Sequence, residues 1–544
     1  MHTMIDRRDF LKSFLASIPV LSLDWDSFPI AHHAHSSSDS YDVIVIGSGL
    51  GGLSCATAFA RQGFKALVIE QHSIPGGYAT AFSRPGGFLF DVSLHSTTIG
   101  SGDPAHKLIP GFPELDGPEF IQHPSLYRAI FPEHDIIVAQ KNLPAYIAQL
   151  VHSFPEEKIG IEALFATMQG LGADIQKLSA ARGKVDMSKF PQEFPTLFAN
   201  YMKTWGQMVD AHLKNNTLKA IVSAQWGYYG LPPSKLSSFY YALPTYDYLV
   251  NGGAYPRGRS QDLSNAFVRF IEAHGGKMLL GTKVEKVLVE KGAAVGVVTK
   301  DRTEYKSKVV VSNASSLMTF QSMIDECDGR AAYLKQLEKY KVSLSSFQIF
   351  LGLNKELVKE AGVKDSEIFI ASGYDHEKGY EQSLRADVTD GGCGVTIYDN
   401  IYEGYSPKGK NTLNIMVLQG YDYWEKYEGD YFNGNKTAYR KAKEEMAGKL
   451  IESVEKRLLP GLSSAIEVKE IGTPLTNLRY TGNYRGAIYG WDQTLGNSGN
   501  SRVGHSTPIK NLFLAGAWSR PGHGYGAVIP SGLECFGEIM NQWK

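Results

Sequence analysis

Residues 41–70 read YDVIVIGSGLGGLSCATAFARQGFKALVIE, and this stretch decides the fold. The apolar run at 41–46 predicts a buried parallel strand, which leads directly into a glycine-rich turn at 47–52. A helix follows, and Gly63 predicts its C-terminal end. The apolar run at 66–69 predicts a second strand that ends on an acidic residue. The stretch therefore predicts a strand–turn–helix–strand unit of the Rossmann type.

The glycines of this turn each have a physical reason. Gly47 permits the tight turn, Gly49 lets the backbone approach a pyrophosphate, and Gly52 lets the helix pack against the strand. Leu50 and Gly51 complete the turn at the N-terminus of the helix, where free N–H groups and a partial positive charge attract phosphate. The turn therefore predicts a dinucleotide-binding site.

Glu70 supports the same interpretation. It follows Gly52 by 18 residues, close to the spacing at which dinucleotide-binding proteins carry an acidic residue. Its carboxylate is expected to accept hydrogen bonds from the hydroxyls of the adenosine ribose. Because a carboxylate repels a 2′-phosphate, the sequence excludes NADP as the ligand of this site.

The loop after the second strand favours FAD over NAD. Residues 71–82 read QHSIPGGYATAF. The Gly76-Gly77 pair resembles the extended motif of FAD proteins, in which this loop passes near the diphosphate and the ribityl chain. We therefore expect Gln71, Gly76, Gly77 and Tyr78 to line the cofactor site.

The C-terminal part supplies a complementary pattern. Residues 511–517, NLFLAGA, predict a strand that ends in small residues, and residues 521–528, PGHGYGAV, lead into a predicted terminal helix. Gly526, Ala527 and Val528 are expected to face the pyrimidine edge of a flavin, where the helix dipole stabilises negative charge in the reduced state. The alternative is a glycine-rich loop that only closes the sheet.

Length and charge exclude several classes of protein. The 544 residues allow three or four domains of roughly 100–200 residues each. A net charge of −1 argues against nucleic-acid binding by bulk charge. The four cysteines, at positions 55, 327, 393 and 535, form no C-x-x-C, so we expect no haem attachment, zinc ribbon, iron–sulfur cluster or disulfide scaffold, and no metal site. No stretch reaches 18 apolar residues, so no good membrane-spanning helix is predicted.

The middle of the chain returns to strand patterns. Residues 281–287 and 287–300 predict strands with a turn at Lys291-Gly292, and residues 309–311 predict another strand. Apolar residues at helical spacing predict an amphipathic helix over 439–458.

These patterns predict an α/β protein with a Rossmann-like FAD-binding domain and an α+β substrate domain, built from interleaved segments. We assign residues 41–100, 250–330 and 470–544 to the FAD-binding domain, and residues 101–249 and 331–469 to the substrate domain. The aromatic segment 190–248 is expected to line an apolar tunnel or to touch a membrane surface, or else to form domain core.

The first 40 residues have the layout of an export signal. Arg7-Arg8-Asp9-Phe10-Leu11-Lys12 precedes an apolar run at 14–23. This string resembles the twin-arginine signal, which exports folded proteins together with their cofactors. We therefore expect a periplasmic or membrane-associated protein; the alternative is a chance basic start on a cytoplasmic one.

The chain as a whole resembles the phytoene-desaturase superfamily of flavoproteins, and within it the retinol saturase and carotenoid isomerase branch. Besides the fingerprint, the matching segments follow one another in the same order as in the family. They are FDVSLH (90–95), GYYGLPPSKLSS (227–238), GGAYPRG (252–258), GTPLTN (472–477), RGAIYG (485–490) and NLFLAGAW (511–518).

The resemblance implies a glutathione-reductase-type FAD-binding fold, non-covalent FAD and an apolar polyene or isoprenoid substrate. Carried over by position, Val284 would contact the adenine through its backbone, and Gly516 and Ala517 would lie near the ribityl chain. We therefore expect an FAD-dependent oxidoreductase that saturates or desaturates a carbon–carbon double bond. The alternatives are a redox-neutral cis–trans isomerase that uses reduced FAD, a flavin amine oxidase, and a non-enzymatic carrier of apolar ligands that retains flavin.

A double-bond reductase needs a proton partner near the flavin. The candidates on the cofactor-proximal motifs are His95, Tyr489, His523 and Tyr525, with His523 the first choice because it lies between two glycines. Each has a structural alternative: a packed aromatic ring, or a histidine that bonds a backbone carbonyl. Since the sequence has one dinucleotide fingerprint, we expect electrons to be exchanged with a quinone or a redox protein rather than with NAD(P)H.

Overall fold

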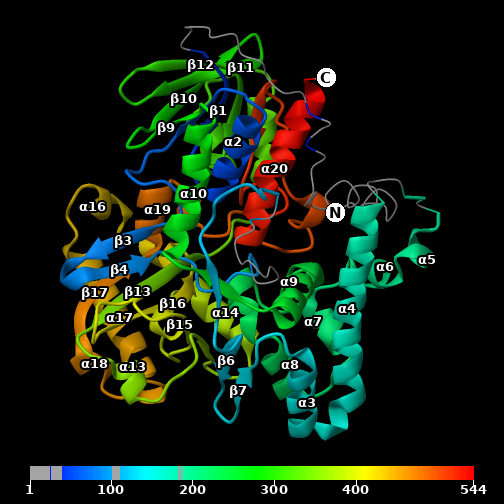
Figure 1. Cartoon of the computed structure of the whole chain (residues 1–544), viewed down its shortest axis with the longest axis vertical. Coiled ribbons are helices and arrows are strands. Elements are labelled where there is room, and N and C mark those ends of the chain that lie inside the picture. The colour runs from blue at the N-terminus through cyan, green and yellow to red at the C-terminus, as the bar shows by residue number, and fades with distance from the viewer. Residues whose placement is uncertain are drawn as a thin grey trace.

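A computed structural model of the chain describes Trp25, Phe28 and residues 40–100, 109, 111–181, 185–186 and 188–543 (Figure 1). The predicted twin-arginine segment lies outside these residues. Within the described part, none of the helices is both long and apolar enough to cross a membrane.

A seven-stranded sheet carries the dinucleotide fingerprint. Its order is β10-β11-β12-β1-β2-β9, with β18 beside β12. The strands are β1 (Ser40–Ile46), β2 (Ala66–Ile69), β9 (Lys277–Leu279), β10 (Val284–Glu290), β11 (Ala293–Thr299), β12 (Glu304–Ser312) and β18 (Leu512–Leu514). β1 pairs in parallel with β2 and β12, β9 with β2, and β18 with β12, so the carboxyl ends of these five strands meet at one edge.

Helices pack against the apolar side chains of this sheet. The helices α2 (Leu50–Arg61), α10 (Arg259–Ala273) and α20 (Tyr525–Gln542) lie together on one face (Figure 1). Val43 and Val45 on one face of β1 and Ile44 on the other are fully buried, as a parallel strand covered on both faces requires. The predicted strand at 66–69 and helix after the turn are confirmed as β2 and α2, and Gly63 follows the helix with a φ of +79°.

The two glycines of the α2 N-terminus allow a very close backbone approach. A Cβ added at Gly52 would lie 2.3 Å from the carbonyl oxygen of Gly47. A Cβ added at Gly51 would lie 2.6 Å from the Cα of Gly516, in the C-terminal segment. Only glycine fits at these contacts, because any side chain would separate α2 from β1 or from the C-terminal segment.

The predicted hairpin in the middle of the chain is confirmed. β10 and β11 are antiparallel, and Lys291 and Gly292 turn between them with φ values of +49° and +77°. The predicted strand at 511–517 is shorter than expected, since β18 covers only Leu512–Leu514. The predicted helix at 439–458 is α17 (Thr437–Arg457).

A second seven-stranded sheet has the order β17-β13-β16-β15-β14-β6-β7. Its strands are β6 (Tyr127–Ile130), β7 (Asp135–Val138), β13 (Ser345–Leu353), β14 (Glu367–Ile370), β15 (Cys393–Ile397), β16 (Asn411–Gln419) and β17 (Ile466–Gly472). α17 packs into the same apolar core as Ile349, Val395 and Ile415. The assigned domain boundary at residue 470 falls inside β17.

Short helices complete this sheet, and a helical lobe stands beside it (Figure 1). Those with the sheet are α13 (Leu357–Glu360), α14 (His376–Leu384), α15 (Asp422–Glu425), α16 (Glu428–Phe432), α18 (Leu462–Ala465) and α19 (Pro474–Thr481). The lobe holds α3 (Leu143–Ser153), α4 (Lys158–Ala180), α5 (Phe190–Glu193), α6 (Pro195–Asn200), α7 (Trp205–Asp210), α8 (Asn216–Val222), the 3-10 helix η4 (Ala224–Tyr229) and α9 (Ser238–Asn251).

Four short strands and two further helices join these parts. β3 (Ala81–Arg84) pairs with β4 (Phe88–Asp91), and β5 (Phe120–Gln122) pairs with β8 (Ala254–Pro256). α11 (Ser316–Ser322) and α12 (Arg330–Leu337) follow β12 along the chain.

We expect Gly52→Ala to destabilise the protein by about 1–3 kcal/mol, because the new methyl group would force α2 away from β1. Gly448→Ala is the matched control. Gly448 lies exposed inside α17, and a Cβ there would meet nothing within 4 Å. It should be neutral or stabilise by up to about 1 kcal/mol. Urea unfolding of both variants tests this, and equal effects would contradict it.

Candidate functional site

A cavity of about 2050 Å³ extends from the first sheet to the second and is lined by residues of both sheets and of the helical lobe. Ligand pockets usually measure about 300–1,000 Å³, so this cavity has room for a cofactor and a second ligand. Its two ends differ in chemistry and are described in turn.

The glycine-rich turn forms one end. Gly47, Gly49, Leu50 and Gly51 line the cavity, whereas Gly52 does not and serves the packing of α2. α2 begins after Gly49 without a side-chain cap and without an acidic residue in its first turn. Its N-terminal N–H groups are therefore suited to bind an anion such as a pyrophosphate.

Glu70 lies at the end of β2 and also lines the cavity. One carboxylate oxygen accepts hydrogen bonds from the backbone N–H and the hydroxyl of Ser48, both at 2.8 Å, and the other accepts one from the N–H of His72 at 2.8 Å. The carboxylate is thus held across the mouth of the turn, where an acceptor for ribose hydroxyls is expected.

The remaining predicted cofactor residues come from four separate segments, and the cavity brings them together. They are Gln71, Gly76, Gly77, Tyr78, Val284, Gly516, Ala517, Gly526, Ala527 and Val528. α20 begins at Tyr525 after Gly524, again with no side-chain cap and no acidic residue in the first turn. A Cβ added at Gly526 would meet no atom of the described part of the chain within 4 Å. A second uncapped helix N-terminus therefore faces this cavity.

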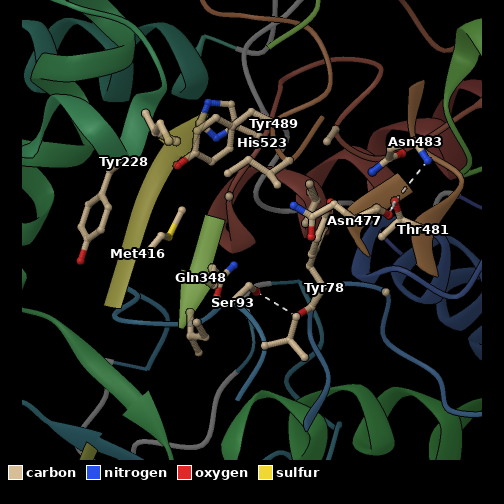
Figure 2. A pocket seen from close by; sticks show the side chains of 18 of the residues that line it. Tyr78, Ser93, Tyr228, Gln348, Met416, Asn477, Thr481, Asn483, Tyr489 and His523 are labelled. Carbon is tan, nitrogen blue, oxygen red and sulfur yellow. Dashed lines mark hydrogen bonds between the residues drawn. The ribbon is translucent and has the colours of Figure 1, made fainter. Parts of the chain in front are cut away.

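Two of the predicted catalytic residues stack on each other. The rings of Tyr489 and His523 lie 4.1 Å apart at an angle of 28° (Figure 2). The Tyr489 hydroxyl donates to the carbonyl oxygen of Gly227 at 2.9 Å. Burial, followed by the positive charge of Arg502, lowers the pKa of His523 to about 3. His523 is therefore neutral at pH 7, and its buried Nε2 has no hydrogen-bond partner among the residues that the structure describes.

The other two candidates lie elsewhere on the cavity wall. Burial raises the pKa of the Tyr525 hydroxyl, so it stays protonated. Asp91 fixes the loop that leads to His95. Its carboxylate accepts hydrogen bonds from the N–H groups of Ser93 and Leu94, each at 3.2 Å. Burial lowers the pKa of His95 to about 4. Its Nδ1 lies 2.5 Å from the hydroxyl of Thr396.

The second sheet contributes cavity residues that the sequence analysis missed. Gln348 and Met416 point into the cavity from β13 and β16, and Tyr228 reaches it from the helical lobe (Figure 2). Glu367 of β14 and Thr396 of β15 also line it. The sequence offers one signal for Glu367, an acidic residue at the start of the apolar strand EIFI. This signal does not show whether the side chain of Glu367 faces the core or the cavity.

Polar side chains also line the wall between the two ends. Asn477 of α19, within the GTPLTN segment, donates to the Ser345 hydroxyl at 3.0 Å. The backbone N–H of Asn483 donates to the Thr481 hydroxyl at 3.1 Å (Figure 2). The Asn483 side-chain oxygen accepts from the Trp518 indole N–H at 2.8 Å. The site thus combines an anion-binding end, a polar middle and an aromatic far end, an arrangement that fits an elongated flavin dinucleotide with a substrate beyond it.

Comparisons with known proteins define the class. A family model described as an NAD(P)-binding Rossmann-like domain matches residues 45–108. Together with the fold, this match defines a protein with a Rossmann-like dinucleotide-binding domain and a second domain that lines the same cavity.

The relatives narrow this class. The chain is 26% identical to the all-trans-retinol 13,14-reductase of Danio rerio, over 93% of this chain and 86% of the relative. It is also 26% identical to the chloroplastic prolycopene isomerase of Daucus carota, over 92% of this chain and 80% of the relative. These matches confirm the predicted resemblance to the phytoene-desaturase-like superfamily.

Solved structures confirm the fold. A putrescine oxidase with bound putrescine superposes with a TM-score of 0.61 at 15% identity, covering 92% of this chain and 99% of that one. A Methanosarcina mazei oxidoreductase gives 0.58 at 16% identity, covering 91% and 100%.

We expect Glu70→Ala to reduce the flavin content of the purified protein by about tenfold or more, because the ribose hydroxyls of the cofactor lose their expected acceptor. The N–H groups of Ser48 and His72 are also left unsatisfied, at about 1–3 kcal/mol each, so they no longer hold the turn in place. Glu272→Ala, an exposed position on α10, is the control and should retain wild-type flavin. Absorbance of the two variants, purified side by side, provides the measurement. A fully loaded Glu70→Ala protein would contradict this assignment.

Proposed function

We propose that the protein is an FAD-dependent oxidoreductase that adds hydrogen to a carbon–carbon double bond of an apolar, polyene- or isoprenoid-like substrate. This proposal rests on one observation: a continuous cavity runs from the glycine-rich turn to the aromatic far end beside the second sheet and the helical lobe. The retinol reductase and prolycopene isomerase relatives, both named for conjugated polyenes, support the substrate class.

The residues present suit non-covalent FAD. The α2 N-terminus would hold the pyrophosphate, Glu70 the ribose hydroxyls and the α20 N-terminus the pyrimidine edge. When bound, FAD supplies hydride chemistry. The protein's own part is to exclude water from the reacting carbon atoms, to hold the polyene in line with the cofactor and to supply a proton.

The far end of the cavity suits an apolar chain. Its lining includes Phe239 and Leu243 of α9, Ile175 of α4 and Phe369 of β14. These side chains come from elements far apart in sequence, and all four belong to the apolar cluster of the helical lobe. An elongated hydrocarbon can bury its surface there at about 25 cal/mol per Å².

A redox-neutral isomerase is the second candidate, and the prolycopene isomerase relatives favour it. It would use the same cavity and change the geometry of a double bond without net hydrogen transfer. The amine oxidases among the solved structures share the fold at about 15% identity, which carries no substrate to this chain.

We further propose that electrons come from a quinone or a redox protein, and that the protein is exported by its twin-arginine-like segment. The single dinucleotide fingerprint of the sequence supports the first point, and Arg7-Arg8 with the following apolar run supports the second. Steady turnover with NADPH alone would contradict the proposed electron source.

The proposed function is tested by single turnover. The purified protein is reduced anaerobically, and all-trans-retinol or a carotenoid mixture is added. We expect the flavin absorbance to return and the product mass to increase by two hydrogens. An altered isomer pattern without a mass change would instead support the isomerase. A reduced flavin that no polyene reoxidises, with no isomer formed, would overturn both.

A further inference from the structure

The register of the second sheet brings a carboxyl group and a hydroxyl group together in the cavity. Glu367 of β14 pairs directly with Thr396 of β15, so their side chains lie on the same face. On the opposite face, the neighbours Ile368 and Val395 enter the apolar core beneath α17. The Thr396 hydroxyl lies 3.1 Å from Glu367 Oε2.

A histidine extends this pair into a chain of three groups. The same Thr396 hydroxyl lies 2.5 Å from His95 Nδ1, and His95 Nε2 lies 3.3 Å from the sulfur of Met416. Since a hydroxyl has one hydrogen, Thr396 donates to one neighbour and accepts from the other. The Thr396 hydroxyl donates to Glu367 Oε2, so it accepts the Nδ1–H of neutral His95, and the carboxyl proton of Glu367 is not used in this chain.

The surroundings keep Glu367 neutral. Its side chain is 2% exposed. Burial raises the pKa of Glu367 to about 8, against smaller opposing effects of the nearby Tyr228 and Thr396 hydroxyls. A general acid works best when its pKa lies near the working pH.

The groups named in the sequence analysis are less suited to give a proton. His523 and His95 are neutral at pH 7, because burial lowers both pKa values. The hydroxyl of Tyr489 is committed to the carbonyl of Gly227, and burial raises its pKa far above 7. Glu367 differs from them because it is a carboxylic acid that stays protonated up to about pH 8 on the cavity wall.

We propose that Glu367 is the acid of this site, and that Thr396 and His95 are its positioning residues. This inference rests on the proposed function. During reduction, the π bond of the substrate breaks. With reduced FAD bound, one carbon would receive the hydride that FAD supplies as it is oxidised, and its neighbour would receive the proton of the Glu367 carboxyl group. The O–H bond breaks, Glu367 becomes a carboxylate, and solvent later returns its proton.

The titratable groups around Glu367 come from several elements. Three tyrosine hydroxyls with raised pKa values lie near it: Tyr228 of η4, Tyr248 of α9 and Tyr398 of the 3-10 helix Tyr398–Asn400. Two histidines with lowered pKa values lie beside the groups around it: His95 contacts Thr396, and His123 contacts the hydroxyl of Ser366. None of these five carries a charge near pH 7, so the ionisation of Glu367 should dominate the pH dependence.

A stability measurement tests the protonation state without turnover. In the unfolded chain Glu367 ionises near pH 4.3, whereas in the folded protein it keeps its proton to about pH 8. Between these values the unfolded state binds fewer protons, so this group costs wild-type stability progressively as the pH rises. Glu367→Gln removes that loss. The melting temperature of Glu367→Gln relative to wild type should therefore increase from pH 5 to pH 9.

Glu381→Gln, at an exposed position on α14, is the control and should show a constant difference from wild type. A constant difference for Glu367→Gln as well would overturn the inference. A second readout is infrared difference spectroscopy, in which the wild-type protein at pH 7 should show a protonated carboxyl band that Glu367→Gln lacks. Absence of that band would likewise overturn it.

Turnover provides the third readout. At equal flavin content, Glu367→Gln should reduce the substrate double bond about 10²–10⁴-fold more slowly than wild type. Thr396→Val should shift the upper pH limit of the reaction, since it removes only the positioning contact. An active wild type with an equally active Glu367→Gln overturns this inference alone. A wild type that reduces no polyene overturns the proposed function instead.

Discussion

The close contact between backbones at the α2 N-terminus is the constraint on which the rest of the structure depends. Gly51 faces Gly516, and Gly52 faces the carbonyl of Gly47, at distances that leave no space for a Cβ. These contacts fix the direction of α2 and bring the C-terminal segment to the same sheet edge as β1. Two uncapped helix N-termini therefore face one cavity, which is why an elongated anionic cofactor fits there.

The second constraint is the register of the other sheet. Side chains alternate between its two faces, so a shift of one residue would exchange the core side chains for the cavity side chains. In the observed register, Ile368 and Val395 support the core, while Glu367 and Thr396 face the cavity. The same register buries the Glu367 carboxyl group, and burial raises its pKa.

The sequence predicts the cofactor end well because its signals are local. The turn at 47–52, the acidic residue 18 positions later and the hairpin at Lys291-Gly292 each lie within a short stretch. The substrate end depends on contacts between distant residues instead: Thr396 lies 301 positions from His95. The burial that makes His523 neutral likewise arises from packing that no local pattern reports.

The proposed function requires that this cavity hold FAD without a covalent bond. To test this, the purified protein is denatured, the polypeptide is removed, and the mass and visible spectrum of the released material are measured. We expect one FAD per chain, all of it in the soluble fraction. A protein expressed with ample flavin that releases no FAD, or that keeps the flavin attached to the polypeptide, would contradict the account.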